Sequence, residues 1–156
     1  MAGLPHVRRT SPRARKPFEV TAPCSTRVTL MKVPILSRSA PAPVGPYSQA
    51  IRAGDHLYVS GMLGIDPATG ALVPGDAAAQ TRQALKNLTM VLQTSGATTS
   101  QVVKTTVFLK SMDDFASVNA AYAEVFKHDP PARSVAQVVR LPKDALVEID
   151  AFVYLK

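Results

Sequence analysis

The chain has 156 residues, 46% of them apolar and 19% charged, which suits one globular domain with a buried core. No apolar run approaches the roughly 18 residues that a membrane-spanning helix needs. The single cysteine, Cys24, excludes an internal disulfide, and the formal net charge of +7 raises the question of a nucleic-acid partner.

Most of the positive charge lies in residues 1–30. This segment contains six basic side chains and one acid, a net charge of +5, whereas the remaining 126 residues contain 12 basic and 10 acidic side chains. The rest of the chain is therefore close to neutral. A basic surface for nucleic acid is not indicated on it.

Residues 1–30 are rich in Arg, Ser, Thr and Pro and lack the apolar region of a secretory signal. Three interpretations remain open: an organellar transit peptide, a disordered basic tail, or translation from a start upstream of Met31. Three prolines would interrupt the helix of a mitochondrial presequence. We expect an extension over 1–30 and one domain over 31–156, in the cytoplasm, or in a mitochondrion or plastid if the extension is a targeting segment.

The domain is predicted to begin with strands. Residues 32–37, "KVPILS", form a candidate first strand, and the stiff, proline-rich "APAPVGPYSQ" follows. The runs "SQAIRA" and "HLYVSG" flank a Gly54-Asp55 turn, which predicts a hairpin. The next segment, "DPATGALVPG", carries turn residues throughout and is predicted to be a loop.

Residues 77–95 are predicted to form an amphipathic helix. Asp76 is the expected N-cap, and Gly96 supplies a residue for the left-handed end of the helix. The apolar residues that share one face at helical spacing are Ala84, Leu85, Leu88, Val91 and Leu92.

A strand, a second helix and two more strands complete the expected order. Residues 101–110 form the strand, with Val103, Thr105, Val107 and Leu109 on one side. The helix is expected to be capped by Asp113 or Asp114 and to end at His128, before a double proline. Its inward side chains are predicted to be Phe115, Val118, Tyr122, Val125 and Phe126. The last strands are expected over 133–140 and 146–155, separated by the turn-forming "LPKDA".

This order, (β)ββ-α-β-α-ββ, indicates a two-layer α+β domain in which helices cover a sheet. The strands also place apolar groups on both sides of the sheet, Phe108 and Phe152 among them. A second apolar face favours burial against another subunit, and hence an oligomer.

Several kinds of chemistry receive no support. His6, His56 and His128 lie far apart without the spacing of metal ligands. Neither a GxGxxG nor a GxxxxGK[ST] motif is present, and no serine lies in a nucleophile elbow. No cofactor is therefore predicted.

Polar residues at the ends of elements are the remaining candidates. Arg133 begins a strand directly after the double proline, and Glu148 lies in the last strand on the same face as Asp150. Tyr47 follows the rigid Gly45-Pro46. Two further candidates are Ser60-Gly61, at the end of the hairpin, and Asn119, beside the apolar stripe of the second helix. Taken singly, each residue also fits an ordinary surface or packing role.

The segments "APAPVGPYSQAI", "YVSG", "VVKTTVFLKSMDDFASVNAAYAEVF", "PPARSVAQV" and "LPKDALVEIDA" resemble the reactive intermediate deaminase family (Rid, YjgF-like). They occur in that family's order and spacing over about residues 32–156. The resemblance implies a chorismate-mutase-like α+β domain with a mixed sheet and two helices on one face. It also implies a homotrimeric barrel with sites between subunits.

The resemblance further implies roles for individual residues. Arg133 would bind a substrate carboxylate, and Glu148 would position or activate water. Tyr47, Ser60, Gly61 and Asn119 would contribute to substrate binding. Two positions depart from the family pattern, Met62 in place of a common glutamine and Val135 in place of a frequent cysteine. We expect both to reshape the pocket more than the chemistry.

The implied reaction is hydrolysis of 2-iminopropanoate and 2-iminobutanoate to 2-oxo acids and ammonia. A guanidinium suits a planar carboxylate because it forms two parallel hydrogen bonds with it. An imine carbon is already electrophilic, so a positioned water and a proton acceptor suffice. Two alternatives remain, an RNA-directed activity and a metabolite-binding trimer without turnover. The near-neutral domain weighs against RNA, and no membrane partner is expected.

Overall fold

The computed structural model describes residues 32–156. The predicted extension over 1–30 lies outside the described residues. Six strands and two α-helices follow in the order β-β-β-α-β-α-β-β: β1 Lys32–Ile35, β2 Ala50–Ala53, β3 His56–Leu63, α1 Ala77–Thr94, β4 Val102–Leu109, α2 Phe115–Ala123, β5 Ala132–Gln137 and β6 Val147–Tyr154.

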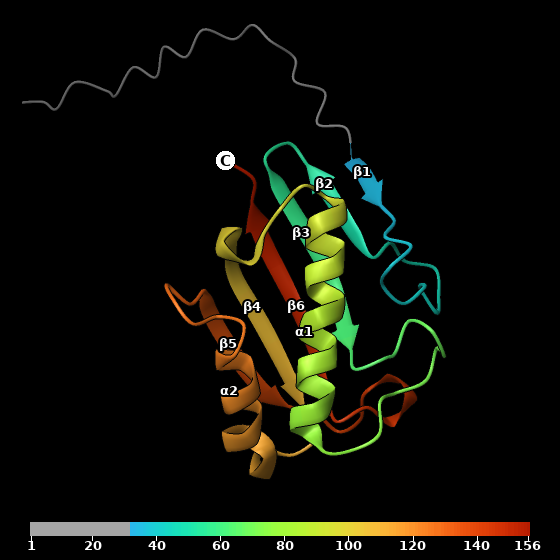
Figure 1. The fold of residues 1–156 in the computed structure, drawn as a ribbon, viewed down its shortest axis with the longest axis vertical. Coiled ribbons are helices and arrows are strands. Elements are labelled where there is room, and N and C mark those ends of the chain that lie inside the picture. Colours follow the sequence, from blue (N-terminus) through green and yellow to red (C-terminus); the bar gives the residue numbers. More distant parts are fainter. Residues whose placement is uncertain (1–31) are drawn as a thin grey trace, which may run out of the picture.

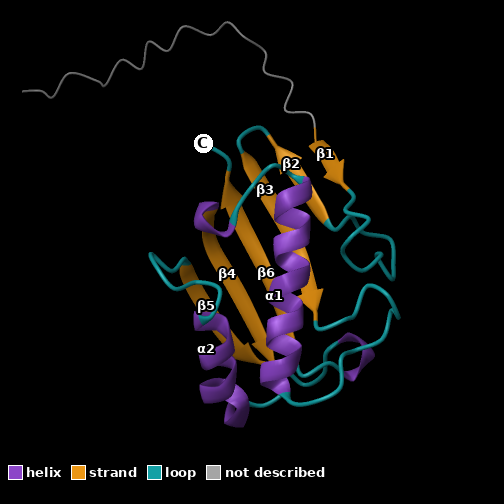
Figure 2. Ribbon diagram, in the orientation of Figure 1, coloured by secondary structure: helices purple, strands orange, loops and turns teal. Residues whose placement is uncertain are grey.

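The strands form one six-stranded sheet in the order β1-β2-β3-β6-β4-β5. Only β4 and β5 run parallel, and every other neighbouring pair is antiparallel. Both helices lie on one face of this mixed sheet, with α1 across its middle and α2 near the β5 edge (Figures 1 and 2). The α+β prediction is confirmed.

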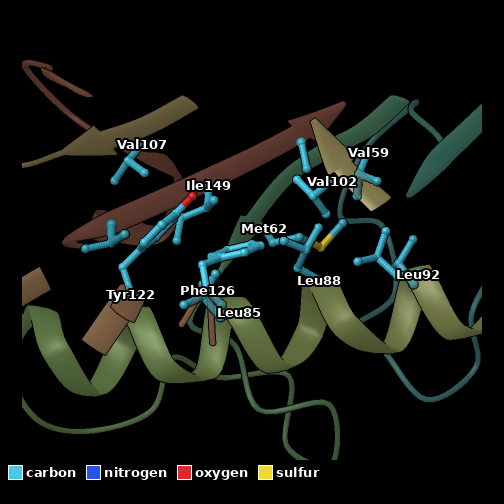
Figure 3. Packing of buried hydrophobic residues seen from close by; sticks show 14 of the residues in the cluster. Val59, Met62, Leu85, Leu88, Leu92, Val102, Val107, Tyr122, Phe126 and Ile149 are labelled. Carbon is cyan, nitrogen blue, oxygen red and sulfur yellow. The ribbon is translucent and has the colours of Figure 1, made fainter. Parts of the chain in front are cut away.

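The hydrophobic core lies between this face of the sheet and α1. Figure 3 shows Met62, Leu85 and Leu88 packed together, with Ile149 of β6 and Tyr122 of α2 beside them. Alternate residues of β6 point into the core, because successive side chains of a strand point to opposite faces. The helix-facing residues of β6 are Val147, Ile149, Ala151 and Val153.

The boundaries of α1 agree with the sequence prediction. Asp76 accepts a hydrogen bond from the backbone N–H of Ala79 at 2.8 Å, which satisfies one of the free donors at the start of the helix. Gly96 has a φ of 74° just beyond the last turn, in the left-handed region that glycine adopts without steric cost.

The second helix is shorter than predicted. It ends at Ala123 instead of His128, because the following turn tightens: Val125 N–H bonds to the carbonyl of Tyr122 three residues back. Phe126 is still buried, so the apolar spacing persists beyond the helix. Asp114 occupies the N-cap position of α2, as one of the two predicted caps, but its side chain makes no capping hydrogen bond. The side chain of Ser111 instead accepts the capping bond of the preceding turn. Phe115, expected to point inward, is 37% exposed.

Two strand predictions also differ from the structure. A register shift between Val102 and Lys104 places Val102 in the core and leaves Val103 51% exposed. The strand predicted over 133–140 ends at Gln137. Beyond it, Val139 is 92% exposed and lies in a connection where pairing with β4 has ceased.

The sheet face away from the helices carries an aromatic cluster that we call the aromatic patch, formed by His56, Tyr58, Phe152 and Tyr154. The rings of Tyr58 and Phe152 meet edge to face with centroids 5.4 Å apart. Phe152 and both tyrosines are 39–44% exposed. Among the described residues, no helix is long and apolar enough to cross a membrane.

Candidate active site

The environment of Glu148 is formed by an irregularity in β3. Val59 pairs with Ala151 and Met62 pairs with Ile149, so β3 has one residue more than β6 between these pairs. Such a bulge bends the strand and lets a residue approach from the side. Ser60 and Gly61 occupy it.

Gly61 leaves the space that the Glu148 side chain occupies. A Cβ atom at Gly61 would lie 2.6 Å from the Glu148 Cδ and 2.8 Å from its Cγ, closer than such atoms come in proteins. The absence of a side chain at Gly61 therefore determines where the carboxylate of Glu148 lies.

Glu148 opens into a cleft of about 210 Å³. The lining is mostly apolar, and the polar groups come from Glu148, Ser60 and Tyr47. Ser60 is held by two contacts, since its hydroxyl donates to the carbonyl of Ser48 at 2.7 Å and its N–H donates to that of Gln49 at 3.0 Å. The complete lining is Val44, Tyr47, Ser60, Gly61, Leu63, Pro142 and Glu148.

Burial raises the pKa of Glu148, and the negative charge of Asp150 on the same face raises it further. Asp150 is itself fixed, because its Oδ1 accepts a hydrogen bond from the N–H of Thr106 at 2.8 Å. A carboxylate with a raised pKa in a cleft is a suitable proton acceptor, because its conjugate acid forms more readily.

Arg133 lies in a second hollow, of about 420 Å³, at the edge of the sheet beside α2. Its guanidinium carbon is 4.6 Å from the centre of the Tyr122 ring, a cation–π distance. The Tyr122 hydroxyl lies 2.7 Å from that of Thr105, which fixes the ring. Within residues 32–156 no carboxylate forms an ion pair with Arg133. The guanidinium is therefore oriented yet free to bind an anion.

Asn119 lines the same hollow as Arg133, together with Pro130 and Pro131. Its Oδ1 is buried and has no hydrogen-bond partner among the described residues. An unpaired buried acceptor is costly, so the hydrogen bonding of this amide is not completed by the described residues. The prediction that Asn119 flanks the apolar stripe of the second helix fits this position.

Within one chain the candidate residues form two groups on opposite faces of the sheet. Arg133 pairs with Thr105 of β4, which in turn pairs with Ala151 of β6, and these residues face the helices. Glu148 occupies an alternate position of β6 and pairs with Leu63 and Phe108 on the other face. Tyr47, Ser60 and Gly61 lie with Glu148, and Asn119 lies with Arg133.

The two departures from the family pattern, Met62 and Val135, line neither the Glu148 cleft nor the Arg133 hollow. Met62 points into the core and is 6% exposed, and it borders a small cavity of about 30 Å³ that Tyr47 and Gly61 also line. Val135 is partly buried against the core. The bulge explains the position of Met62, because it turns this residue toward the helices instead of toward Glu148. Across residues 32–156, no three His, Cys, Asp or Glu side chains are grouped as metal ligands.

Sequence analysis did not identify three of the residues that line the cleft. Val44, Leu63 and Pro142 come from separate segments of the chain, and their apolar side chains carry no motif of their own. Pro142 lies in the turn-forming "LPKDA", shortly before Glu148, and Val44 lies in the proline-rich segment, shortly before Tyr47. The signal for these two residues was their place in a stiff segment of the chain close to a candidate site residue.

The family model for Endoribonuclease L-PSP matches residues 37–155. The chain therefore belongs to this family, which includes the Rid and RutC proteins.

Individual relatives are similar over most of the domain. A RutC family protein of Pyrococcus horikoshii is 50% identical over 124 residues, which cover 80% of this chain and 98% of the relative. The 2-iminobutanoate/2-iminopropanoate deaminase of Mus musculus is 44% identical over 123 residues, covering 79% and 91%. The structure of Escherichia coli TdcF with bound serine is 35% identical, with a TM-score of 0.76 over 79% of this chain and 98% of that one.

Proposed function

We propose that this protein hydrolyses reactive 2-imino acids, 2-iminopropanoate and 2-iminobutanoate, to 2-oxo acids and ammonia. The observation that carries the proposal is the pair of uncompensated charges at the two sites. Arg133 is a guanidinium without an acidic partner in the described chain, and Glu148 is a carboxylate with a raised pKa beside an apolar cleft. The deaminase name of the mouse relative supports the same reaction.

The substrate's carboxylate and imine carbon are adjacent atoms, so both charges must reach one small molecule. In a single protomer the sheet separates Arg133 from Glu148. We infer that a second copy of the chain brings its Arg133 hollow against the Glu148 cleft. The exposed aromatic patch favours such an assembly, and the trimer implied by the resemblance would provide it.

The chemistry then needs few groups. Arg133 binds the carboxylate by two parallel hydrogen bonds, and Glu148 removes a proton from water as its oxygen attacks the imine carbon. The protonated Glu148 gives this proton to the imine nitrogen, which yields a carbinolamine. The hydroxyl proton of the carbinolamine then passes through Glu148 to the nitrogen, the C–N bond breaks, ammonia leaves, and the hydroxyl oxygen becomes the carbonyl of the 2-oxo acid.

The test is release of 2-oxo acid above the uncatalysed rate, from imino acids generated in situ by a threonine dehydratase or an amino-acid oxidase. Arg133→Ala should lower kcat/KM by about a hundredfold or more, because two charged hydrogen bonds are lost. Arg133→Lys should rescue little of this loss, since an ammonium cannot form the paired contact. Wild-type activity in Arg133→Ala would contradict the proposal.

An RNA-directed activity is the alternative function, because the matching family is described as Endoribonuclease L-PSP. The domain's 12 basic and 10 acidic side chains give little electrostatic attraction for RNA. RNA cleavage that survived removal of residues 1–30 and copurified with the protein would favour that alternative. Binding of 2-oxo acids without any turnover would instead favour a metabolite-binding trimer.

A further inference from the structure

Residues 36–48, which we call the proline-rich loop, form one wall of the Glu148 cleft. They connect β1 to β2 as an irregular segment at the β1 side of the sheet (Figure 1). Val44 and Tyr47 at the far part of the loop line the cleft, and they are 60% and 47% exposed. Side chains this exposed contribute little packing of their own, so the loop must be held from elsewhere.

The side chain of Gln49 supplies three contacts at the base of the loop. Its Oε1 accepts a hydrogen bond from the N–H of Ser37 at 2.6 Å, and its Nε2 donates to the carbonyls of Ser37 at 3.2 Å and Pro41 at 2.7 Å. Gln49 is 2% exposed. Buried hydrogen bonds of this kind are expensive to leave unmade, so they hold the loop strongly.

The same residue also connects the loop to the bulge of β3. The carbonyl of Gln49 accepts from the N–H of Ser60, while the hydroxyl of Ser60 donates to the carbonyl of Ser48. At the other end of the loop, the hydroxyl of Ser37 lies 2.8 Å from that of Thr94 at the end of α1. Gln49 thus joins the loop, β3 and, through Ser37, α1.

We propose that Gln49 is a positioning residue that acts through Tyr47: its carboxamide closes the proline-rich loop so that Tyr47 and Val44 form a fixed wall of the cleft. This inference rests on the proposed function for its activity readout. Tyr47 precedes Gln49 by only two residues in the sequence. If the hydrogen bonds of the Gln49 side chain were lost, Tyr47 would therefore be displaced directly. Loss of the Gln49 contacts should mainly weaken substrate binding, because the position of Glu148 depends on the space left at Gly61 and not on the loop.

The first experiment compares Gln49→Met, Tyr47→Ala and the double variant in the imine assay. We expect Gln49→Met to raise KM by about tenfold with a smaller change in kcat, since it loses all three hydrogen bonds and leaves Glu148 in place. In the Tyr47→Ala background the same substitution should change KM less than twofold, because the residue through which it acts is gone. Effects that multiply would overturn the inference.

Thr81→Val is the matched control. Thr81 is a fully buried polar residue whose hydroxyl bonds only to the carbonyl of Ala77 within α1. Its loss removes a buried hydrogen bond without contact to the loop, and KM should stay at the wild-type value. If Gln49→Met fails to fold, Gln49→Glu keeps the volume and the acceptor for Ser37 N–H but loses both donors, and the same KM increase is expected.

A second readout does not depend on turnover. In the wild type, the amides of Tyr47 and Ser60 bond to the carbonyls of Gly45 and Gln49. Hydrogen exchange at these two amides should accelerate at least tenfold in Gln49→Met and not in Thr81→Val. Unchanged exchange would overturn the inference even in an active enzyme. Accelerated exchange in a protein without deaminase activity would leave the positioning role intact and refute the proposed function alone.

Discussion

At the scale of the residue, the candidate site depends on two absences within the described residues: Gly61 has no side chain, and Arg133 has no ion-pair partner. Glu148 reaches its cleft because Gly61 has no side chain, and Arg133 is available because no carboxylate within the described residues pairs with it. Sequence analysis named both residues and their neighbours. It could not place them on opposite faces of the sheet, since that requires the register of β4, β5 and β6.

Gly61→Ala should lower kcat by tenfold or more while the protein remains folded. The added methyl group would collide with the flexible end of Glu148, which can rotate away at little cost in stability but then leaves its working position. Steady-state kinetics and thermal unfolding measure the two effects separately.

Gly64→Ala is the control for this change. A Cβ at Gly64 would lie 2.8 Å from backbone atoms of Gln80, which cannot move aside. We expect it to lower the melting temperature far more than Gly61→Ala does. The account of Gly61 would be contradicted if Gly61→Ala unfolded the protein and left the kcat of the folded fraction unchanged.

The pH dependence follows from the raised pKa of Glu148. The carboxyl must be ionised to accept a proton, so kcat/KM should fall as the pH decreases through this pKa. Asp150→Asn removes the neighbouring charge that contributes to the shift and keeps an oxygen for Thr106 N–H. The acid limb of the pH–rate profile should therefore move to lower pH. No movement would show that another group controls the limb.

The raised pKa of Glu148 also predicts that replacing this residue makes the protein more stable and less active. Because the folded-state pKa of Glu148 lies above its unfolded value, ionisation at neutral pH disfavours the folded state. Glu148→Gln should therefore increase the free energy of unfolding at pH 7 while it removes activity. The gain should vanish below the unfolded pKa of about 4.3, where the wild-type carboxyl is protonated in both states.

At the scale of the element, capping and periodicity predicted α1 well, whereas the elements around the site departed from their patterns. The bulge at Ser60–Gly61 and the register shift at Val102 interrupt strict alternation, which assigns one face to every second residue. The predicted end of α2 was wrong for a similar reason. Phe126 is buried and continues the apolar spacing after the helix has ended, so the spacing alone predicts a longer helix. Local irregularities of this kind have no signal in an unbroken apolar pattern.

Asp76→Ala tests the cap of α1. Loss of the hydrogen bond to Ala79 N–H should lower the free energy of unfolding by about 1 kcal/mol, measured by urea denaturation. Asp76→Asn should retain most of the stability, since its side-chain oxygen can accept the same bond. Because the cap lies outside the lining of the cleft, kcat should be unchanged in both variants.

At the scale of the whole molecule, one sheet carries two half-sites and an exposed aromatic patch. Sequence analysis predicted a second apolar face from Phe108 and Phe152, and Phe152 is indeed 39% exposed on the face away from the helices. The extent of the patch and its position relative to Glu148 follow only from the strand order. The exposed patch and the two separated groups of candidate residues support the proposal that the functional unit is an assembly, in which Arg133 of one copy meets Glu148 of another.

Complementation between two inactive variants, Arg133→Ala and Glu148→Gln, shows directly whether the two residues act from different copies of the chain. The variants are unfolded together in equal amounts and refolded. In a trimer with sites between subunits, about three-quarters of the assemblies are mixed, and each mixed assembly has one intact site out of three. We therefore expect recovery of about one quarter of wild-type activity, against none when either variant, or the double variant, is refolded alone. A mixture as inactive as its components would contradict this expectation, because Arg133 and Glu148 would then serve a substrate from the same chain or not at all.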